Sequence, residues 1–269
     1  MEMKNAILRS VLSLLAVVAV GGPVRAQSSD SMVMDSSDLF YSIVDYRLPG
    51  VEVTYPNSKQ SELWNGHEKP SGEIVFPMTI IHNGNQFEVI EISPWTFADC
   101  GEITSVTLTN HLHSIGFAAF ARCTGIRTID IPASVDYLGG CAFFACHTLE
   151  SVSLPTGLKR IKAYTFADCP ALRKIEIPAG VEAIGISAFD RSGLTEVTLP
   201  PTLKALGENA FRRCKDLRQV RSMNAEPPKV GEGAFSEIAP EAVLFVPRGS
   251  REAYLAAKGW DTFSCIEEY

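Results

Sequence analysis

The sequence lacks the short motifs that mark the common catalytic and nucleotide-binding sites. It contains no G-x-S-x-G, no H-E-x-x-H and no G-x-x-x-x-G-K-[ST]; such motifs carry hydrolytic nucleophiles, zinc ligands and phosphate-binding loops respectively. Its carboxylates and histidines also show no pairing of a nucleophile with a base and no set of metal ligands. We therefore expect no enzymatic activity, no metal site and no cofactor.

Positive charge is scarce as well. The 269 residues include 24 Lys and Arg against 31 Asp and Glu, which gives a formal charge of −7 and a pI near 5.3. A chain with this balance has no general attraction for nucleic acid, so we expect no nucleic-acid partner. Hydrophobic residues make up 46% of the chain, which favours a globular fold over a disordered one.

The sequence has only one long apolar run, VLSLLAVVAV (11–20). Ten residues are too few to span a bilayer, which takes about 20. Lys4 and Arg9 precede the run, and small residues follow it up to Ala26. This order is typical of a secretory signal peptide, so we expect residues 1–26 to be removed and the protein to be secreted, periplasmic or associated with the cell surface. We expect no transmembrane segment in the mature chain.

A period of about 23 residues is the main positive feature. One Phe recurs in seven copies, a Cys follows it by three residues in five of them, and an alternating apolar pair comes later in each copy. The Phe positions are Phe97, Phe120, Phe143, Phe166, Phe189, Phe211 and Phe235, and the Cys positions are Cys100, Cys123, Cys146, Cys169 and Cys214. Proline closes four of the alternating segments, at Pro132, Pro155, Pro178 and Pro200. One copy is shortened at Ser192-Gly193.

A period of this length indicates a solenoid, because each copy can bury its apolar positions only against its neighbours. The segment AYTFADC (163–169) is expected to form a short helical or 3₁₀ turn, and residues 172–178 a strand that stacks in parallel with its equivalents. Proline at the strand end stops the hydrogen-bond ladder at a corner, because it has no N–H to donate.

The pattern AFxxCxxLxxIxIPxxVxxI resembles the leucine-rich repeats of BspA-like bacterial surface proteins over about residues 86–240. The resemblance implies a right-handed solenoid with a parallel concave β-sheet and short turns on its convex side. It also implies adhesion to host matrix or to other microbes. The chain departs from the family pattern at the shortened copy and at Thr109, where a strand-ending proline is expected.

The solenoid ends need caps, and the flanking segments supply candidates. After the signal peptide we expect a mobile polar segment (27–38), a β-rich N-terminal cap (39–88), the repeats (89–240) and a C-terminal cap (241–269) of one strand and one helix. Asn83-Gly84 predicts a hairpin turn in the first cap. In the second, Ser250 is expected to cap the helix and Gly259 to end it, with Trp260, Phe263 and Ile266 folding over the last repeat.

The repeated cysteines should point inward and behave as small buried hydrophobes. Stacked strands lie about 5 Å apart, so disulfides between coils are sterically possible, but unbridged thiols are the preferred interpretation. Cys141 lies at a variable position and is expected to be exposed on the convex side. Together with Cys146 and His147 it suggests a zinc half-site, but no second cluster complements it.

The expected binding surface is the concave sheet, because repeat proteins often bind there. Its candidate residues point outward between the apolar strand positions: Thr128, Asp130, Ser151, Ser153, Lys174, Glu176, Glu196, Thr198, Gln219 and Arg221. No aromatic residue occurs among the outward positions of these repeats. The aromatics Trp64, Trp95 and Tyr164 form a competing site, and a merely solvated sheet is the alternative to either.

The sequence therefore favours a secreted or surface-associated, non-catalytic binding module. Its partner would be an extracellular protein or glycan, and the resemblance adds a role in adhesion. The alternative is a structural or assembly component of the cell envelope without a specific soluble ligand.

Overall fold

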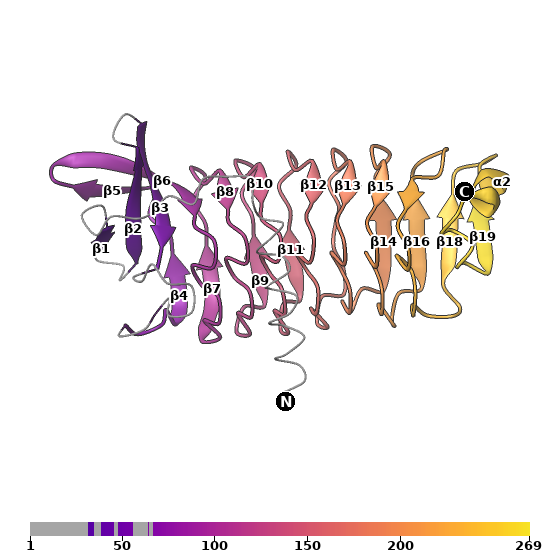
Figure 1. Cartoon of the computed structure of the whole chain (residues 1–269), viewed down its shortest axis with the longest axis horizontal. Helices are drawn as coiled ribbons and strands as arrows, with labels where there is room; N and C mark the ends of the chain where they lie inside the picture. Colours follow the sequence, from indigo (N-terminus) through magenta and orange to yellow (C-terminus); the bar gives the residue numbers. More distant parts are fainter. Residues whose placement is uncertain (1–31, 35–38, 46–47, 56–63, 65–66) are drawn as a thin grey trace. The chain divides into compact units, whose positions relative to one another are not determined.

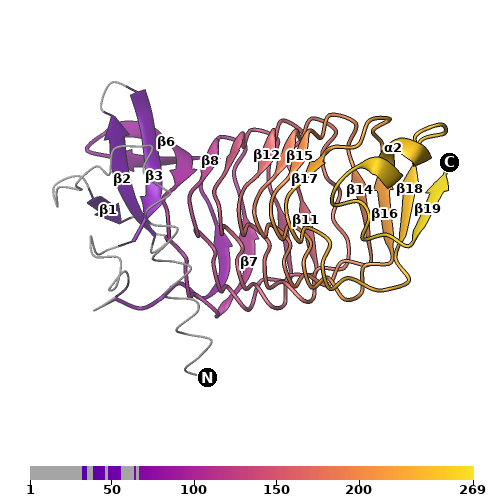
Figure 2. The same ribbon diagram turned by 45° about the vertical axis from the view of Figure 1, so that its right-hand side comes forward.

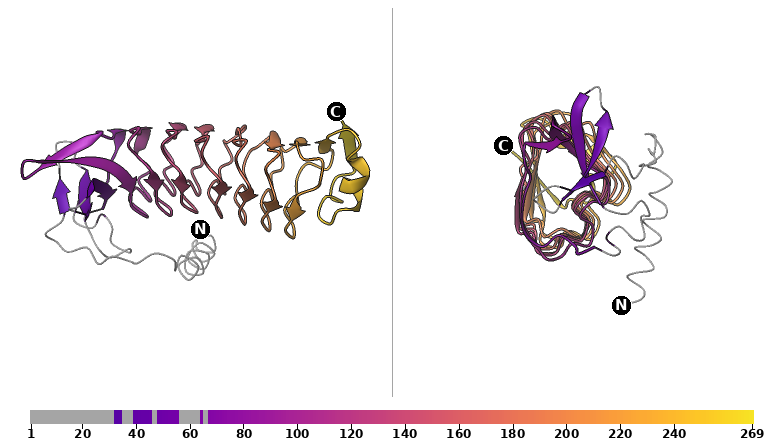
Figure 3. Two further views of the ribbon diagram at one scale, coloured as in Figure 1. Left: turned by 90° about the horizontal axis from the view of Figure 1, so that it is seen from above. Right: turned by 90° about the vertical axis from the view of Figure 1, so that its left-hand side faces the viewer.

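The computed structural model describes residues 32–34, 39–45, 48–55, 64 and 67–269. The predicted signal peptide (1–26) and most of the predicted polar segment (27–38) lie outside the described residues. Residues 32–269 form one compact unit, in which successive coils stack side by side as a solenoid (Figure 1). Seen along its axis, the coils nearly superpose (Figure 3).

Most coils contribute a longer strand and a shorter strand, and the strands of each kind run parallel to their equivalents in neighbouring coils. The longer strands form what we call the long-strand face: β4 (Gly72–Val75), β7 (Ile103–Thr107), β9 (Thr128–Asp130), β11 (Ser151–Ser153), β14 (Glu196–Leu199), β16 (Gln219–Ser222), β18 (Val243–Val246) and β19 (Cys265–Glu268). They pair in parallel, as the sequence predicts, but in three separate sheets: β4–β7, β9–β11 and β14–β16–β18–β19.

The shorter strands form a second ladder, the short-strand face: β6 (Asn85–Ile92), β8 (Ser114–Ile115), β10 (Tyr137–Leu138), β12 (Arg160–Ile161), β13 (Ala183–Ile184), β15 (Ala205–Leu206) and β17 (Lys229–Val230). These strands contain the apolar residues that precede each repeated Phe. The sequence analysis did not predict that they pair as strands.

The turns around the repeated Phe differ from the expected helical or 3₁₀ turn. In the coil of Phe166, residues two positions before and after it, Tyr164 and Asp168, have left-handed backbone (φ 58° each). Ala167 N–H donates to Tyr164 O within the turn (3.3 Å), whereas Phe166 N–H donates to Ala188 O of the next coil (2.8 Å). Because alternate amides bond to the next coil, these turns form a third ladder that a helix would not allow.

The core of the solenoid is a continuous stack of the repeated Phe rings. Phe166, which is fully buried, lies 5.6 Å from Phe143 and 5.5 Å from Phe189 between ring centroids, with the planes nearly parallel. The stack ends on edge-to-face contacts, with Phe76 at one end and Phe263 at the other. The predicted inward direction of the Phe column is therefore confirmed.

The seven cysteines are free thiols, as the sequence favours, and those of the repeats are buried. Cys146 Sγ donates to Phe120 O of the preceding coil (3.1 Å), and Cys169 and Cys123 make the same contact one coil on and one coil back. Burial raises the pKa of the Cys146 thiol to about 12. The predicted exposure of Cys141 is wrong: it is 1% exposed. Tyr164, at the same position of the next coil, has the same left-handed backbone but is half-buried, so the small size of the cysteine side chain is what distinguishes the two.

The corners of the coils follow the proline positions. Pro155 O accepts from Leu158 N–H (3.1 Å), and Thr109 O accepts from Leu112 N–H in the same way (3.1 Å), so threonine fills the proline position without loss of the turn. In the shortened copy, Ser192 occupies the cysteine position and its N–H donates to Phe189 O (3.0 Å). The missing residue is therefore on the Gly193 side of that turn.

The N-terminal end of the solenoid is covered by β1 (Met32–Met34), β2 (Phe40–Asp45) and β3 (Leu48–Thr54), an antiparallel set that joins β6. β5 (Thr79–His82) pairs with β6 across Asn83 and Gly84, which both have positive φ, so the predicted hairpin is confirmed. β4 lies within the predicted cap (39–88) but belongs to the solenoid itself, because it pairs with β7.

At the other end, α2 (Arg251–Ala256) precedes β19 (Figure 2). Ser250 takes the N-cap position, as predicted, although its side chain makes no capping bond. The predicted end of the helix at Gly259 is wrong, because the helix ends at Ala256 with Ala257 as its C-cap. Trp260 and Phe263 pack on Phe235 at 5.4 and 5.0 Å, as expected. No helix among the described residues is long and apolar enough to cross a membrane.

Candidate ligand-binding face

The candidate residues lie where the sequence places them, on the outside of the long-strand face. Ser151 and Ser153 are in register with Thr128 and Asp130, and Gln219 and Arg221 are in register with Glu196 and Thr198. Arg221 is half-buried and the other nine are exposed. The alternation of residues along the strands therefore assigned these side chains to the correct face.

The ten residues do not form one continuous surface, because the ladder of the long-strand face is interrupted at residues 174–177. This segment is extended but lies outside the strands. The structure records no backbone hydrogen bond from it to the coil before or after. Thr128, Asp130, Ser151 and Ser153 lie on one side of the interruption, and β14 and β16 begin on the other.

A groove of about 380 Å³ opens at this interruption, between residues 174–177 and β14. Four of the ten candidates line it: Lys174, Glu176, Glu196 and Thr198. Ile175, Ile177 and Val197 also line it, although Ile175 and Val197 are core residues, 5% and 3% exposed. Four residues that sequence analysis placed on separate strands are thus brought together around one hollow.

The shortened turn lies directly before this groove. Gly193 N–H donates to Cys169 O of the preceding coil (3.2 Å), and a Cβ at Gly193 would lie 2.1 Å from Pro170 O. Thr195 N–H then donates to Arg173 O (3.1 Å), after which the two coils make no further backbone bond along the strand. The glycine therefore holds the two coils close at the turn, and the groove begins where that contact ends.

The polar groups of the groove are mainly charged. Lys174 Nζ lies 3.1 Å from Glu196 Oε1 across the opening, and both side chains are largely exposed. An exposed pair of this kind contributes at most about 1 kcal/mol to stability, so a ligand can replace it at little cost. Glu176 forms no ion pair in the described part of the chain.

Aromatic rings do occur on the long-strand face, contrary to the expectation from the repeats alone. The Arg221 guanidinium lies 4.3 Å from the centroid of the Tyr269 ring and 5.3 Å from that of Phe245. Phe245 is in register with Arg221 on β18, and Tyr269 is 43% exposed. Both rings belong to the C-terminal cap, which is why the repeat columns did not reveal them. They hold the guanidinium in place by cation–π contact.

The competing aromatic site is not supported for Trp64. Its side chain is 6% exposed and its Nε1–H donates to Thr96 O (3.0 Å), so it closes the end of the core. Trp95 is half-buried and packs edge-to-face on Phe117, with 5.2 Å between centroids, and Tyr164 is also half-buried. The three aromatics therefore differ in accessibility, and Trp64 is withdrawn as a candidate.

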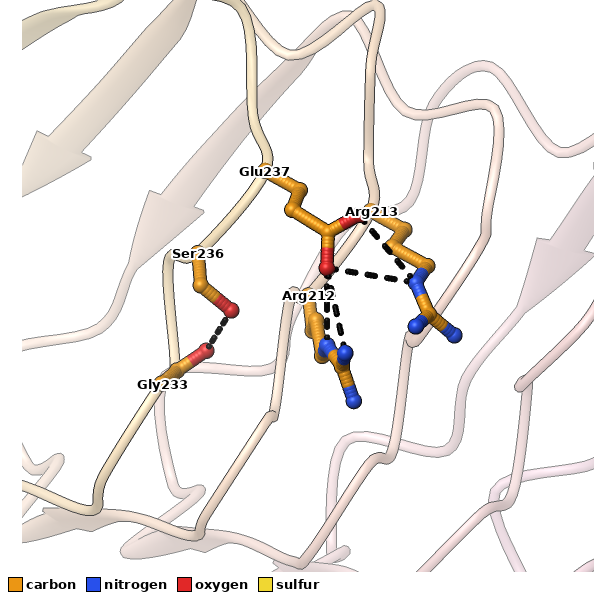
Figure 4. A network of polar contacts seen from close by, with 5 residues as sticks. All are labelled: Arg212, Arg213, Gly233, Ser236 and Glu237. Carbon is orange, nitrogen blue, oxygen red and sulfur yellow. Dashed lines mark hydrogen bonds and ion pairs between the residues drawn. The ribbon is translucent and has the colours of Figure 1, made fainter.

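Most charges on the Phe turns are neutralised by the neighbouring coil. Glu237 accepts hydrogen bonds from Arg212 (3.1 Å) and Arg213 (3.3 Å), as Figure 4 shows. The Arg212 bond, followed by that of Arg213, lowers the pKa of Glu237. Arg122 pairs with Asp99 and His147 approaches Asp168 in the same way. These pairs link adjacent coils, which leaves the turns a mixed, locally neutral surface.

In the part of the chain that the structure describes, no group of three or more His, Cys, Asp or Glu side chains is placed to hold a metal ion.

Comparisons with known proteins agree with this architecture. The family model described as "BspA type Leucine rich repeat region" matches residues 90–238 in six copies. A leucine-rich cell surface protein from Faecalibacterium prausnitzii superposes with a TM-score of 0.56 at 23% identity, over 76% of this chain and 57% of that one. A leucine-rich repeat protein from Bacteroides ovatus gives 0.43 at 20% identity, over 88% of this chain and 76% of that one. No curated protein matches the chain.

Proposed function

Since the chain belongs to the family of BspA-type leucine-rich repeat proteins, we propose that it is a non-catalytic binding module that recognises an extracellular protein or glycan, with adhesion as its role. The proposal places recognition on the long-strand face, at the groove beside residues 174–177. Export through the apolar segment 11–20 brings this surface to the outside of the cell.

The groove is the observation that carries the proposal. Extended segments bind well at an interrupted sheet, because unpaired backbone groups give affinity and flanking side chains give specificity. Residues 174–177 offer such backbone groups, and Lys174, Glu176 and Glu196 offer charges of both signs. An extended segment of a partner protein therefore suits this groove better than a single protruding anchor side chain, which would need a deep apolar pocket.

Binding to a panel of matrix proteins and glycans tests the proposal. The variant Lys174→Glu should abolish capture of the bound partner while its melting temperature stays near that of the parent, because Lys174 lines the groove and its side chain is largely exposed. Binding should weaken as salt rises through physiological ionic strength, where the Debye length is about 8 Å. The matched control is Lys258→Glu, which makes the same charge change at an exposed position of the C-terminal cap.

Binding that is insensitive to salt and survives the first variant would place the site elsewhere. Self-association without capture of any partner would favour the envelope component instead. Export is tested separately by the intact mass of the native protein, which should begin at Gln27. A mature chain that retains residues 1–26 would contradict it.

A further inference from the structure

Six of the seven coils carry a small residue four positions before the stacked Phe. Five of these are glycines: Gly116, Gly139, Gly185, Gly207 and Gly231. A Cβ at any of the five would lie 2.4–2.6 Å from backbone atoms of the preceding coil, so only glycine permits that approach. Ser93, the sixth, faces the cap strand β3 and bonds to Val53 O (2.8 Å). In the remaining coil the position is occupied by Lys162.

The short-strand face is interrupted at Lys162. Each of the five glycines donates its N–H to a carbonyl of the preceding coil, as Gly139 does to Ile115 O (2.8 Å) and Gly185 to Ile161 O (2.8 Å). No such bond is recorded from Lys162 to the coil of β10. β10 ends one sheet and β12 begins another. The side chain of Lys162 therefore keeps the two coils apart on this face, whereas Cys141 N–H still bonds to Ala163 O (3.0 Å) at the adjoining turn.

Positive charge gathers at the interruption. Lys159 and Arg160 are exposed and form no ion pair in the part of the chain that is described. Lys162 Nζ lies 3.5 Å from the centroid of the Tyr137 ring, on the other side of the break, and Tyr137 is 45% exposed. We call Tyr137, Lys159, Arg160 and Lys162 the basic break.

The acidic side chains nearest along the same face only partly offset this charge. Glu182, one coil on from Lys159, is bound by Lys204 Nζ at 2.7 Å. That bond, with smaller effects of Lys159 and Arg160, lowers the pKa of Glu182. Asp136, one coil back, is exposed and forms no ion pair among the described residues. A net positive patch therefore occurs on a chain whose formal charge is −7.

We propose that the basic break is a second binding site, and that it takes an anionic polysaccharide carrying sulfate or carboxylate groups. Arg160 offers a planar fork for such groups, and Lys162 offers an ammonium held in place on the Tyr137 ring. Tyr137 is 45% exposed, so its ring also offers apolar surface for a sugar. The site is independent of the groove on the long-strand face.

The surroundings favour a saccharide over other anionic polymers. A site for single-stranded nucleic acid needs several aromatic side chains on which bases can stack along a basic track. The basic break has only one aromatic ring beside its three cationic side chains. A protein partner needs a buried apolar anchor, and the exposed ring of Tyr137 is half covered by Lys162. An extended sugar chain, by contrast, requires only repeated charge and one ring face.

Equilibrium binding of the full chain to four polymers tests the proposal: heparin, hyaluronate, neutral dextran and poly-L-glutamate. We expect binding to at least one of the two charged glycans, no binding to dextran, and weakening as salt rises from about 50 to about 300 mM. Arg160→Gln and Lys162→Gly should each lower the affinity about tenfold, since each removes a charged hydrogen-bonding partner. The control Lys258→Gln, at an exposed position of the C-terminal cap, should leave it unchanged.

Lys162→Gly carries a second readout, because it restores the glycine of the other coils. The amide at position 162 should gain protection from hydrogen exchange as β10 and β12 close, and stability should not fall. Poly-L-glutamate binding as tightly as the glycans would overturn the saccharide assignment. Failure of both glycans to bind, or unchanged affinity in Arg160→Gln and Lys162→Gly, would overturn the site itself. None of these outcomes depends on the groove beside Lys174.

Discussion

Removal of one ring from the Phe stack should be among the most damaging single changes in this protein. Phe166 is fully buried and stacked on both faces, at 5.6 Å from Phe143 and 5.5 Å from Phe189. Phe→Ala in a core costs about 3–5 kcal/mol, and each stacked pair adds roughly 0.5–1.5 kcal/mol beyond area burial. Ladder bonds fix the backbone on both sides, as from Phe166 N–H to Ala188 O, so the void has little room to collapse. We therefore expect a loss near the upper end, about 4–5 kcal/mol.

Urea unfolding followed by circular dichroism measures this loss. Because coils interact only with their neighbours, Phe166→Ala should also broaden or split the transition by uncoupling the two halves of the stack. Lys174→Ala, in the same coil but with a largely exposed side chain, should cost no more than about 0.5 kcal/mol. Equal losses from Phe166→Ala and Lys174→Ala would refute the assignment of inward and outward positions.

Two further predictions follow from burial and close approach. At pH 8 a thiol reagent should modify essentially Cys265 alone in the folded protein, because Cys265 is only partly buried. After denaturation the reagent should modify all seven cysteines. If five or more thiols fail to react in the denatured protein, the repeats are cross-linked by disulfides. Gly185→Ala should cost about 1–3 kcal/mol in a urea titration, because its Cβ would lie 2.6 Å from Ala163 N, whereas Gly157→Ala, with nothing within 4 Å, should change stability by less than about 0.5 kcal/mol. Similar costs at the two glycines would show that the coils can separate freely.

The repeat period was enough to predict what each coil buries. Phe166, Cys169 and Ile175 are buried and Lys174 is exposed, because a column of identical residues can be satisfied only by stacking and the strand alternation fixes the opposite face. The hairpin at Asn83 was predictable for a local reason, since both turn residues adopt positive φ.

Features that depend on contact between coils were not predictable from one coil at a time. The groove beside Lys174 requires two neighbouring coils to diverge after Gly193, and strand alternation carries no information on that separation. Cys141 was assigned to the exposed side because it lies at a variable position of the repeat, but sequence variability does not report how the neighbouring coils pack over that position. Phe245 lies 24 residues after Arg221, so extending the repeat count into the cap would have found it.

The interruptions described above have a mechanical consequence. Near the ends of the solenoid, adjacent coils are joined on both faces, as by the pairing of β14 with β16 and of β15 with β17. At several central junctions, adjacent coils are joined by strand pairing on only one of the two faces. β9 joins β11 where β10 and β12 are apart, and β12 joins β13 where residues 174–177 are free of backbone bonds. The Phe-turn ladder alone runs through every one of these junctions. The solenoid therefore resembles a spring with stiff ends and a softer middle: under bending or tension along its axis, the central coils would yield first, around the turn ladder as their shared spine.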